Sequence, residues 1–168
     1  MLRKAEIESH LRELAAELTQ RNTKGEICLY GGAVMCLAFD ARPATRDVDA
    51  VFAPTSVIRE AASAIASRHG LSDDWLNDAV KGYVVPHERR VLLDLPSLKI
   101  FVPEAEYMLA MKALAARADS SDRDDVRFLI KHLVITHPER VFAILRRFYP
   151  REQIRPATRF FIEELFES

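Results

Sequence analysis

A pair of adjacent glycines constrains the N-terminal half of this chain more than any other feature. Gly31 and Gly32 follow the run EICLY, whose β-branched and aromatic residues predict a strand over 26–30, and precede AVMCLAF, which predicts a short helix. Glycine tolerates the backbone conformations of a sharp turn and lets backbone N–H groups and a helix start approach an anion closely. The pair therefore predicts a tight strand-to-helix turn that could hold phosphate groups.

A second predicted strand, over 47–53, carries two acidic side chains. Residues two apart on a strand point to the same face, so Asp47 and Asp49 project together while Val48 and Ala50 turn into the core. Neighbouring carboxylates repel unless a cation holds them, and Mg²⁺ takes oxygen ligands from carboxylates, water and phosphates. Alone, the glycine pair is an ordinary turn and the acidic strand an ordinary solvated edge. In this order they predict a phosphate and Mg²⁺ site.

The remaining periodicity places these strands among helices. A helix is expected over 2–21, and another begins near Thr55 and ends at Gly70. Further expected elements are a short helix at 72–80, strands at 90–95 and 98–102, and helices at about 103–117, 121–133, 137–148 and 151–167. The order predicts an α+β protein whose first half is α/β-like. A small mixed sheet flanked by helices forms a core over 1–102, and a helical region over 103–168 packs on it.

Composition excludes several classes of protein. Apolar residues make up 49% and charged residues 29% of the chain, as in a globular domain rather than a disordered one. The net charge of −1 gives no overall attraction to nucleic acid, so any such contact needs a local basic patch. No stretch approaches the roughly 20 apolar residues that span a bilayer. We expect a cytoplasmic protein with no membrane partner.

A lysine within an apolar helical stripe marks the C-terminal half. Lys112 shares a face with Met108 and Leu109, which indicates a buried partner or a position near phosphates. Asp122 and Asp125 point inward at the head of the next predicted helix. We expect Lys112 or Arg117 to pair with one of them. The alternatives are a snorkelling lysine and an ordinary acidic helix start.

The histidines carry no recognisable ligand spacing, so the sequence assigns them no role. They are His10, His69, His87, His132 and His137.

The glycine turn and the acidic strand together resemble the nucleotidyltransferase superfamily of the DNA polymerase β type. Its pattern is a Gly-Gly or Gly-Ser turn followed by a strand with two aspartates. The chain is most similar to the bacterial abortive-infection toxin-type nucleotidyltransferases, which add an Arg, a Thr or Ser, and a later helix with Lys and Arg before D-x-x-D. The matching residues are Gly31, Gly32, Arg42, Thr45, Asp47, Asp49, Lys112, Arg117, Asp122 and Asp125.

The resemblance implies an enzyme that moves a nucleoside monophosphate from a nucleoside triphosphate to a hydroxyl of RNA, tRNA included, or of a protein. Asp47, Asp49 and a third carboxylate would bind two Mg²⁺ ions. Asp94, a lone acid in VLLDL, is the first candidate for that third ligand and for the general base, although it also fits as the residue leading into the turn at Pro96. Glu104 is the second candidate for the third ligand. The implied nucleotide contacts are Gly31, Gly32, Arg42, Thr45, Arg46 and Lys112. A role as a toxin with a cognate antitoxin would follow.

Two residues depart from the family pattern. Ala33 stands where relatives place Ser or Thr, and Arg46 rather than an apolar residue precedes Asp47. These departures favour a rival interpretation, a binding or regulatory module that keeps the fold with weak or no turnover. A third interpretation, a small-molecule nucleotidyltransferase of the antibiotic-modifying kind, requires a wide acceptor cleft. Convergence of Asp47, Asp49 and Asp94 would discriminate the enzyme from the module.

Overall fold

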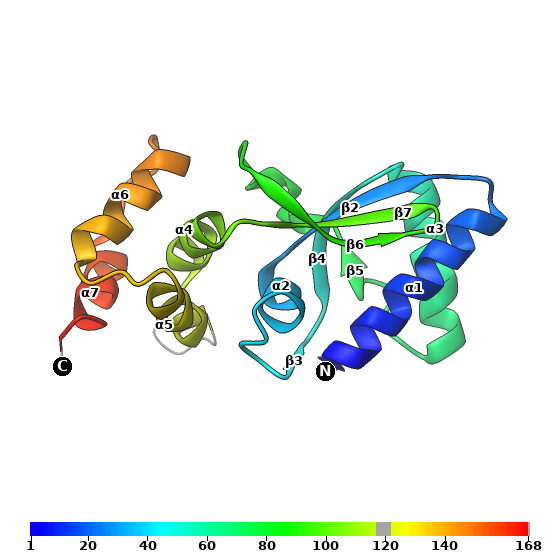
Figure 1. Ribbon diagram of the computed structural model, residues 1–168, viewed down its shortest axis with the longest axis horizontal. Helices are drawn as coiled ribbons and strands as arrows, with labels where there is room; N and C mark the ends of the chain where they lie inside the picture. The colour runs from blue at the N-terminus through cyan, green and yellow to red at the C-terminus, as the bar shows by residue number, and fades with distance from the viewer. Residues whose placement is uncertain (117–121, 168) are drawn as a thin grey trace. The chain divides into compact units, whose positions relative to one another are not determined.

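The computed structural model describes residues 1–116 and 122–167 and divides into two compact units (Figure 1). Unit 1 comprises Met1–Val84 and Arg89–Pro103. Unit 2 comprises Val85–Glu88 and the chain from Glu104 onward. The sequence predicted a single division at residue 102, and the assignment of Val85–Glu88 to the helical unit was not foreseen.

Unit 1 is a mixed five-stranded sheet with helices. In chain order its elements are β1 (Leu2–Arg3), α1 (Lys4–Gln20), β2 (Gly25–Tyr30), α2 (Gly31–Leu37), β3 (Ala44–Thr45), β4 (Val48–Ala53), α3 (Thr55–His69), β5 (Leu76–Asn77), the 3-10 helix η1 (Ala79–Gly82), β6 (Arg89–Leu95) and β7 (Leu98–Pro103). The strand order is β5-β4-β2-β7-β6. β2 runs antiparallel to β4 and parallel to β7, β5 is parallel to β4, and β6 is antiparallel to β7. The predicted α+β class with a small mixed sheet is confirmed.

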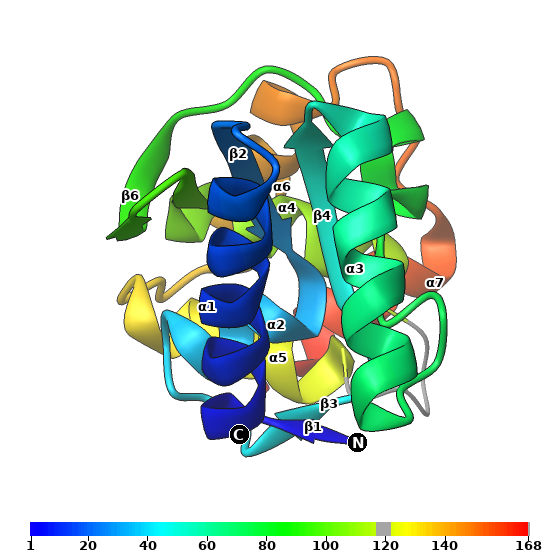
Figure 2. The ribbon, with the colours of Figure 1, turned by 90° about the vertical axis from the view of Figure 1, so that its right-hand side faces the viewer.

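Helices α1 and α3 lie side by side across the sheet (Figure 2). The predicted apolar stripe of α1 is fully buried; its residues are Ile7, Leu11, Leu14 and Leu18. α3 ends at Gly70, whose φ of +66° is the left-handed cap that glycine adopts without strain. A second small sheet pairs Leu2–Arg3 with Ala44–Thr45. Neither of these strands was predicted from the sequence.

The predicted short helix over 72–80 is wrong. Its central residues form β5, which pairs in parallel with the start of β4, and the following residues form η1. Trp75 and Leu76 are buried, and the backbone N–H of Val48 donates to the carbonyl of Trp75 at 2.6 Å. A long-range strand pairing has therefore overridden the local helical pattern.

Unit 2 contains four helices within its described residues. They are α4 (Ala105–Ala115), α5 (Asp122–His132), α6 (Pro138–Phe148) and α7 (Pro156–Glu164). A proline opens each of the last two, as expected at the first helical position, and α7 begins later than the predicted residue 151. Val85–Glu88 joins this unit through Tyr107 of α4. The Tyr107 ring stacks on His87 at 4.0 Å, and its hydroxyl accepts a hydrogen bond from the Val85 N–H at 3.1 Å.

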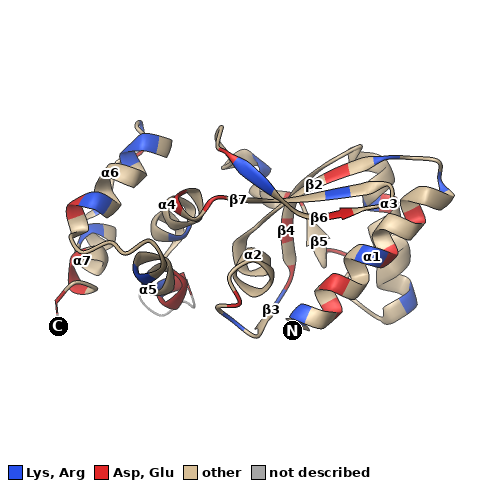
Figure 3. Ribbon diagram, in the orientation of Figure 1, with Lys and Arg blue, Asp and Glu red and all other residues tan. Residues whose placement is uncertain are grey.

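Charges of both signs are interspersed over the helices and strands (Figure 3). In unit 2, Arg140 and Arg147 of α6 both bond to Glu106 of α4, at 2.9 and 2.8 Å. Part of the basic charge near the C-terminus is thus neutralised by packing within the unit. Across the described residues, no helix combines the length and apolarity needed to cross a membrane.

Candidate functional site

The predicted glycine turn and acidic strand meet in unit 1. β2 and β4 pair with Tyr30 opposite Asp49, so the residue before the turn faces the second aspartate. Gly31 has a φ of +62°, and a Cβ added there would lie 2.7 Å from Oδ2 of Asp49. Glycine is required at this position both by the left-handed backbone and by the carboxylate against its α-carbon.

The second glycine adjoins two further residues of the predicted site. A Cβ added at Gly32 would lie 2.5 Å from Nη1 of Arg42 and would overlap Oγ1 of Thr45. Thr45 is buried on β3, and its hydroxyl donates to the carbonyl of Asp47 at 3.3 Å. The space beside both glycines is therefore filled by side chains of the predicted site.

Burial along β4 follows the alternation predicted from its sequence. Val48 and Ala50 are fully buried, whereas Asp47 and Asp49 are half-buried. Burial raises the pKa of the Asp47 carboxyl, the nearby Asp74 raises it further, and the charge of the exposed Arg46 opposes both. Burial and the charge of Asp74 therefore both disfavour the ionised form of the Asp47 carboxyl.

Asp74 is an acidic neighbour that sequence reasoning missed. It precedes β5, and the pairing of Leu76 with Val48 brings the segment before β5 beside the start of β4. Asp74 is exposed, and its charge acts on Asp47. Asp73 and Asp74 directly precede Trp75 in the sequence. Their position in the fold depends on the two-residue strand β5, which could not be predicted from the neighbouring residues.

Asp94 does not join the aspartate pair. It lies exposed on the edge strand β6 opposite Lys99, which in turn is opposite Glu26 at the start of β2. Asp49 lies at the other end of β2, and β2 and β7 separate β4 from β6. With about 4.8 Å between strands and 3.3 Å per residue, Asp94 and Asp49 are on the order of 20 Å apart. The prediction that Asp94 completes the metal site is therefore not supported, and the residue instead leads into the β6–β7 turn.

Lys112 has two acidic partners in unit 2. Its Nζ lies 2.6 Å from Oδ1 of Asp122 and 2.9 Å from Oδ2 of Asp125. Lys112 and Asp125 are buried. The predicted pairing between the two helices is confirmed for Lys112, and Arg117 lies outside the described residues. Because the carboxylates of Asp122 and Asp125 balance its charge, Lys112 has a structural role in joining α4 to α5. This weakens the prediction that it binds the nucleotide.

A compact group of ligand side chains occurs elsewhere in unit 1. Among residues 1–116 and 122–167, ligand atoms of three His, Cys, Asp or Glu residues lie within 4.8 Å of one another at His10, Glu13 and His69, and no such trio includes Asp47 or Asp49. A metal at the aspartate pair would therefore draw its remaining ligands from water and substrate.

Comparison with family models, with curated proteins and with solved structures finds no match to this chain.

Proposed function

We propose that unit 1 is a Mg²⁺-dependent nucleotidyltransferase that moves a nucleoside monophosphate from a nucleoside triphosphate to a hydroxyl of RNA, tRNA included, or of a protein. The observation that carries the proposal is the contact of Asp49 with Gly31. It places the acidic strand against the glycine turn, where Arg42 and Thr45 adjoin Gly32. A carboxylate, a guanidinium and a hydroxyl thus lie at one turn, and these are groups that can bind a metal–triphosphate.

The two aspartates would hold Mg²⁺ together with the triphosphate. Mg²⁺ is commonly bound by one or two carboxylates while substrate phosphates and water fill the rest of its octahedral shell. A cation bound at Asp47 would offset the burial and the charge of Asp74, which raise the pKa of its carboxyl. A second Mg²⁺ would enter with the substrate, because Asp94 is too distant to provide another carboxylate.

The basic residues of the turn have separate proposed roles. Arg42, beside Gly32, would contact the triphosphate, since a guanidinium binds phosphate oxygens in a bidentate manner. Arg46 is exposed next to Asp47 and could meet the triphosphate or an RNA acceptor. We leave Lys112 out of the site because Asp122 and Asp125 already bind its ammonium group.

The separation of Asp94 favours a second candidate function. A module that binds the metal–nucleotide and regulates a partner, such as a cognate antitoxin, needs the two aspartates and the turn but no third carboxylate. Ala33, which removes a hydroxyl contact to phosphate, favours the same candidate. Both candidates predict nucleotide binding that depends on Asp49, and only the enzyme predicts turnover.

The decisive experiment measures binding and turnover on the same preparations. Wild type, Asp47→Asn and Asp49→Asn are incubated with each α-labelled nucleoside triphosphate, Mg²⁺, total RNA and a protein extract, and calorimetry measures nucleotide binding. Asp94→Asn is the matched control, being an exposed aspartate on another strand.

Incorporation that is lost in Asp47→Asn and Asp49→Asn but retained in Asp94→Asn supports the enzyme. Binding without incorporation supports the regulatory module. Loss of incorporation in Asp94→Asn contradicts the two-aspartate site, and absence of Mg²⁺-nucleotide binding contradicts both candidates.

A further inference from the structure

A second group of ligand side chains lies where α1 and α3 pack together in unit 1. His10 and Glu13 are three residues apart on α1, so they lie on the same side of the helix. His69 is the last residue of α3. None of the three contributes to the proposed Mg²⁺ site.

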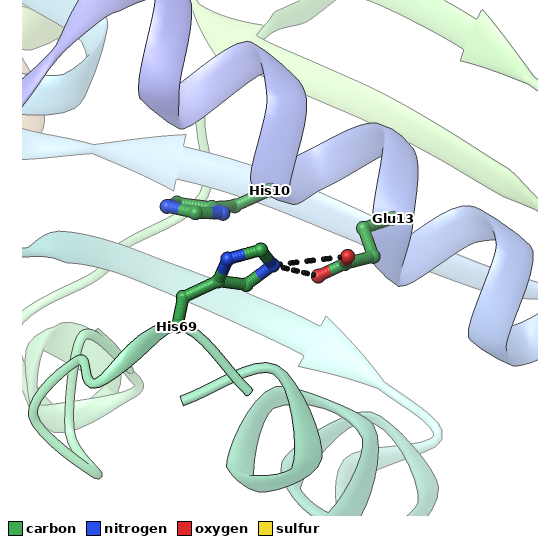
Figure 4. A group of neighbouring side chains, drawn as sticks. All are labelled: His10, Glu13 and His69. Atoms are coloured by element: carbon green, nitrogen blue, oxygen red, sulfur yellow. Dashed lines mark hydrogen bonds and ion pairs between the residues drawn. The ribbon is translucent and has the colours of Figure 1, made fainter. Parts of the chain in front are cut away.

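The three side chains converge on one another (Figure 4). Nε2 of His69 lies 3.0 and 2.9 Å from the two carboxylate oxygens of Glu13. The centroids of the His10 and His69 rings lie 5.1 Å apart, and the two ring planes are tilted by 49°. One ligand atom from each residue can be chosen so that all three lie within 4.8 Å. Donors of a tetrahedral zinc site, with bonds of about 2.0–2.2 Å, lie roughly 3.4 Å apart, so small side-chain rotations would close the group.

The protonation states suit a metal. Burial lowers the pKa of His10 and the neighbouring His69 lowers it further, which favours the neutral imidazole that a metal needs. For Glu13, burial alone would raise the pKa, but its bonds to His69 and Arg68 outweigh burial and leave the pKa lowered. The group therefore offers a neutral imidazole and a carboxylate near neutral pH.

The residues around the group would allow Glu13 to exchange its present contacts for a metal ion. Arg68 contacts Glu13 at 3.3 Å, but it makes a shorter ion pair with Glu17 at 2.7 Å, which it would keep. His10 packs edge-on against Trp75 at 5.5 Å, and the Trp75 indole N–H is anchored to the Ala62 carbonyl at 2.9 Å. The His10 ring thus packs against Trp75 and also lies next to His69.

We propose that His10, Glu13 and His69 bind one divalent transition-metal ion of the zinc class. Two imidazoles and one carboxylate suit Zn²⁺, Co²⁺ or Ni²⁺ rather than Mg²⁺ or Ca²⁺, which prefer oxygen ligands. Binding replaces the hydrogen bonds between His69 and Glu13 and joins α1 to α3. Because His69 is 41% exposed at its side chain and Glu13 28%, a water molecule can occupy the fourth position.

The test uses the full chain with any affinity tag removed, after treatment with a chelator. Titration with Co²⁺ is followed by visible absorption, and Zn²⁺ affinity is measured by competition with a chromogenic chelator. The variants are His69→Gln and Glu13→Gln. The matched control is His132→Gln, because His132 is an exposed histidine that also ends a helix, α5 in unit 2. Circular dichroism verifies that each variant is folded.

We expect one equivalent of Co²⁺ or Zn²⁺ to bind to wild type and to His132→Gln with equal affinity. Each of the other two variants should weaken Zn²⁺ binding at least about 10-fold. The buried His10 is examined without substitution, as its imidazole resonances should shift together with those of His69 when Zn²⁺ is added. Equal affinity of wild type and His69→Gln, displacement of Co²⁺ by excess Mg²⁺, or unshifted His10 resonances would each overturn the proposal. None of these outcomes bears on nucleotidyl transfer.

Discussion

The Asp49 carboxylate lies against the α-carbon of Gly31, at a point where an added Cβ would be 2.7 Å from Oδ2. The left-handed backbone of Gly31 and the side-chain position of Asp49 therefore depend on each other. A change at either residue should be felt at the other. This coupling can be measured, because Gly70 is a second left-handed glycine. Among the described residues, apart from its two chain neighbours, no atom lies within 4 Å of a Cβ added there.

Gly31→Ala should destabilise the protein more than Gly70→Ala. Both substitutions place alanine in the left-handed region, which costs about 1–2 kcal/mol. Only Gly31→Ala also displaces a carboxylate, and we expect it to cost at least about 1 kcal/mol more. Urea denaturation of the two variants provides the comparison. Equal losses in the free energy of unfolding would show that Asp49 moves aside without cost.

Asp47→Asn should stabilise the metal-free protein at pH 7. Because burial and then Asp74 raise the pKa of Asp47, its contribution to stability is present below the unfolded pKa of 3.8 and is lost as the pH rises through the folded pKa. The amide avoids this cost, so the gain should be up to about 1 kcal/mol at pH 7 and vanish near pH 3. Urea unfolding at the two pH values measures it. A variant that is less stable than wild type at pH 7 would show that the charge of Asp47 is well compensated.

Lys112→Met should destabilise unit 2 strongly. It leaves two carboxylates facing each other without their cation, one of them buried, and removing one member of such a group costs about 3 kcal/mol or more. Arg127→Met is the control, because Arg127 pairs with the exposed Asp124 on the surface of α5 and should cost less than about 1 kcal/mol. Chemical denaturation followed by circular dichroism compares the two. Similar losses in the free energy of unfolding for both variants would mean that the ion pairs of Lys112 with Asp122 and Asp125 contribute no more than a surface pair.

The stability of unit 1 should fall as the pH drops below 6.5, in part because of His10. Burial, followed by the nearby His69, lowers its folded pKa, while Glu13 and Glu6 on α1 oppose this effect and Arg68 of α3 lies beside Glu13. Above 6.5 both states hold a neutral His10. From 6.5 down to the lowered pKa, the unfolded chain takes up a proton that the folded chain does not, so unfolding is favoured.

The His10 contribution should be on the order of 1 kcal/mol between pH 7.5 and pH 5. His10→Phe keeps a ring beside Trp75 and should lose less stability over this interval than wild type does in the same urea experiment. An identical loss in both proteins would remove His10 as the cause.

Local sequence signals predicted most of the helices and long strands. The end of α3 at Gly70, the start of α6 at Pro138 and the apolar stripe of α1 each depend on residues that are close in sequence. They could therefore be predicted from the sequence. The β1–β3 ribbon, β5 and the placement of Val85–Glu88 depend on partners far away in sequence. Trp75 illustrates the limit: its neighbours resemble a helix, yet the pairing of Leu76 with Val48 makes them a strand.

The candidate site shows the same division. The alternation of the buried Val48 and Ala50 with the less buried Asp47 and Asp49 follows from the two-residue period of a strand. The closeness of Asp49 to the glycine turn follows from the antiparallel pairing of β2 with β4. Asp94 failed as a prediction because sequence alone does not give the order of strands in a sheet. His10 and His69 were assigned no role because they come together only when α1 packs on α3.

Tyr107 contacts the segment Val85–Glu88, which precedes it in the chain. Its ring and hydroxyl hold His87 and the Val85 amide, although the strands Arg89–Leu95 and Leu98–Pro103 of unit 1 intervene. A gene fragment that begins at residue 104 would therefore encode helices deprived of one piece of their own unit. During synthesis on the ribosome, residues 85–88 emerge before α4, so they can pack on Tyr107 only after α4 has been made. Anyone who separates the two units should rejoin this segment to the helices through a linker, rather than cut the chain once.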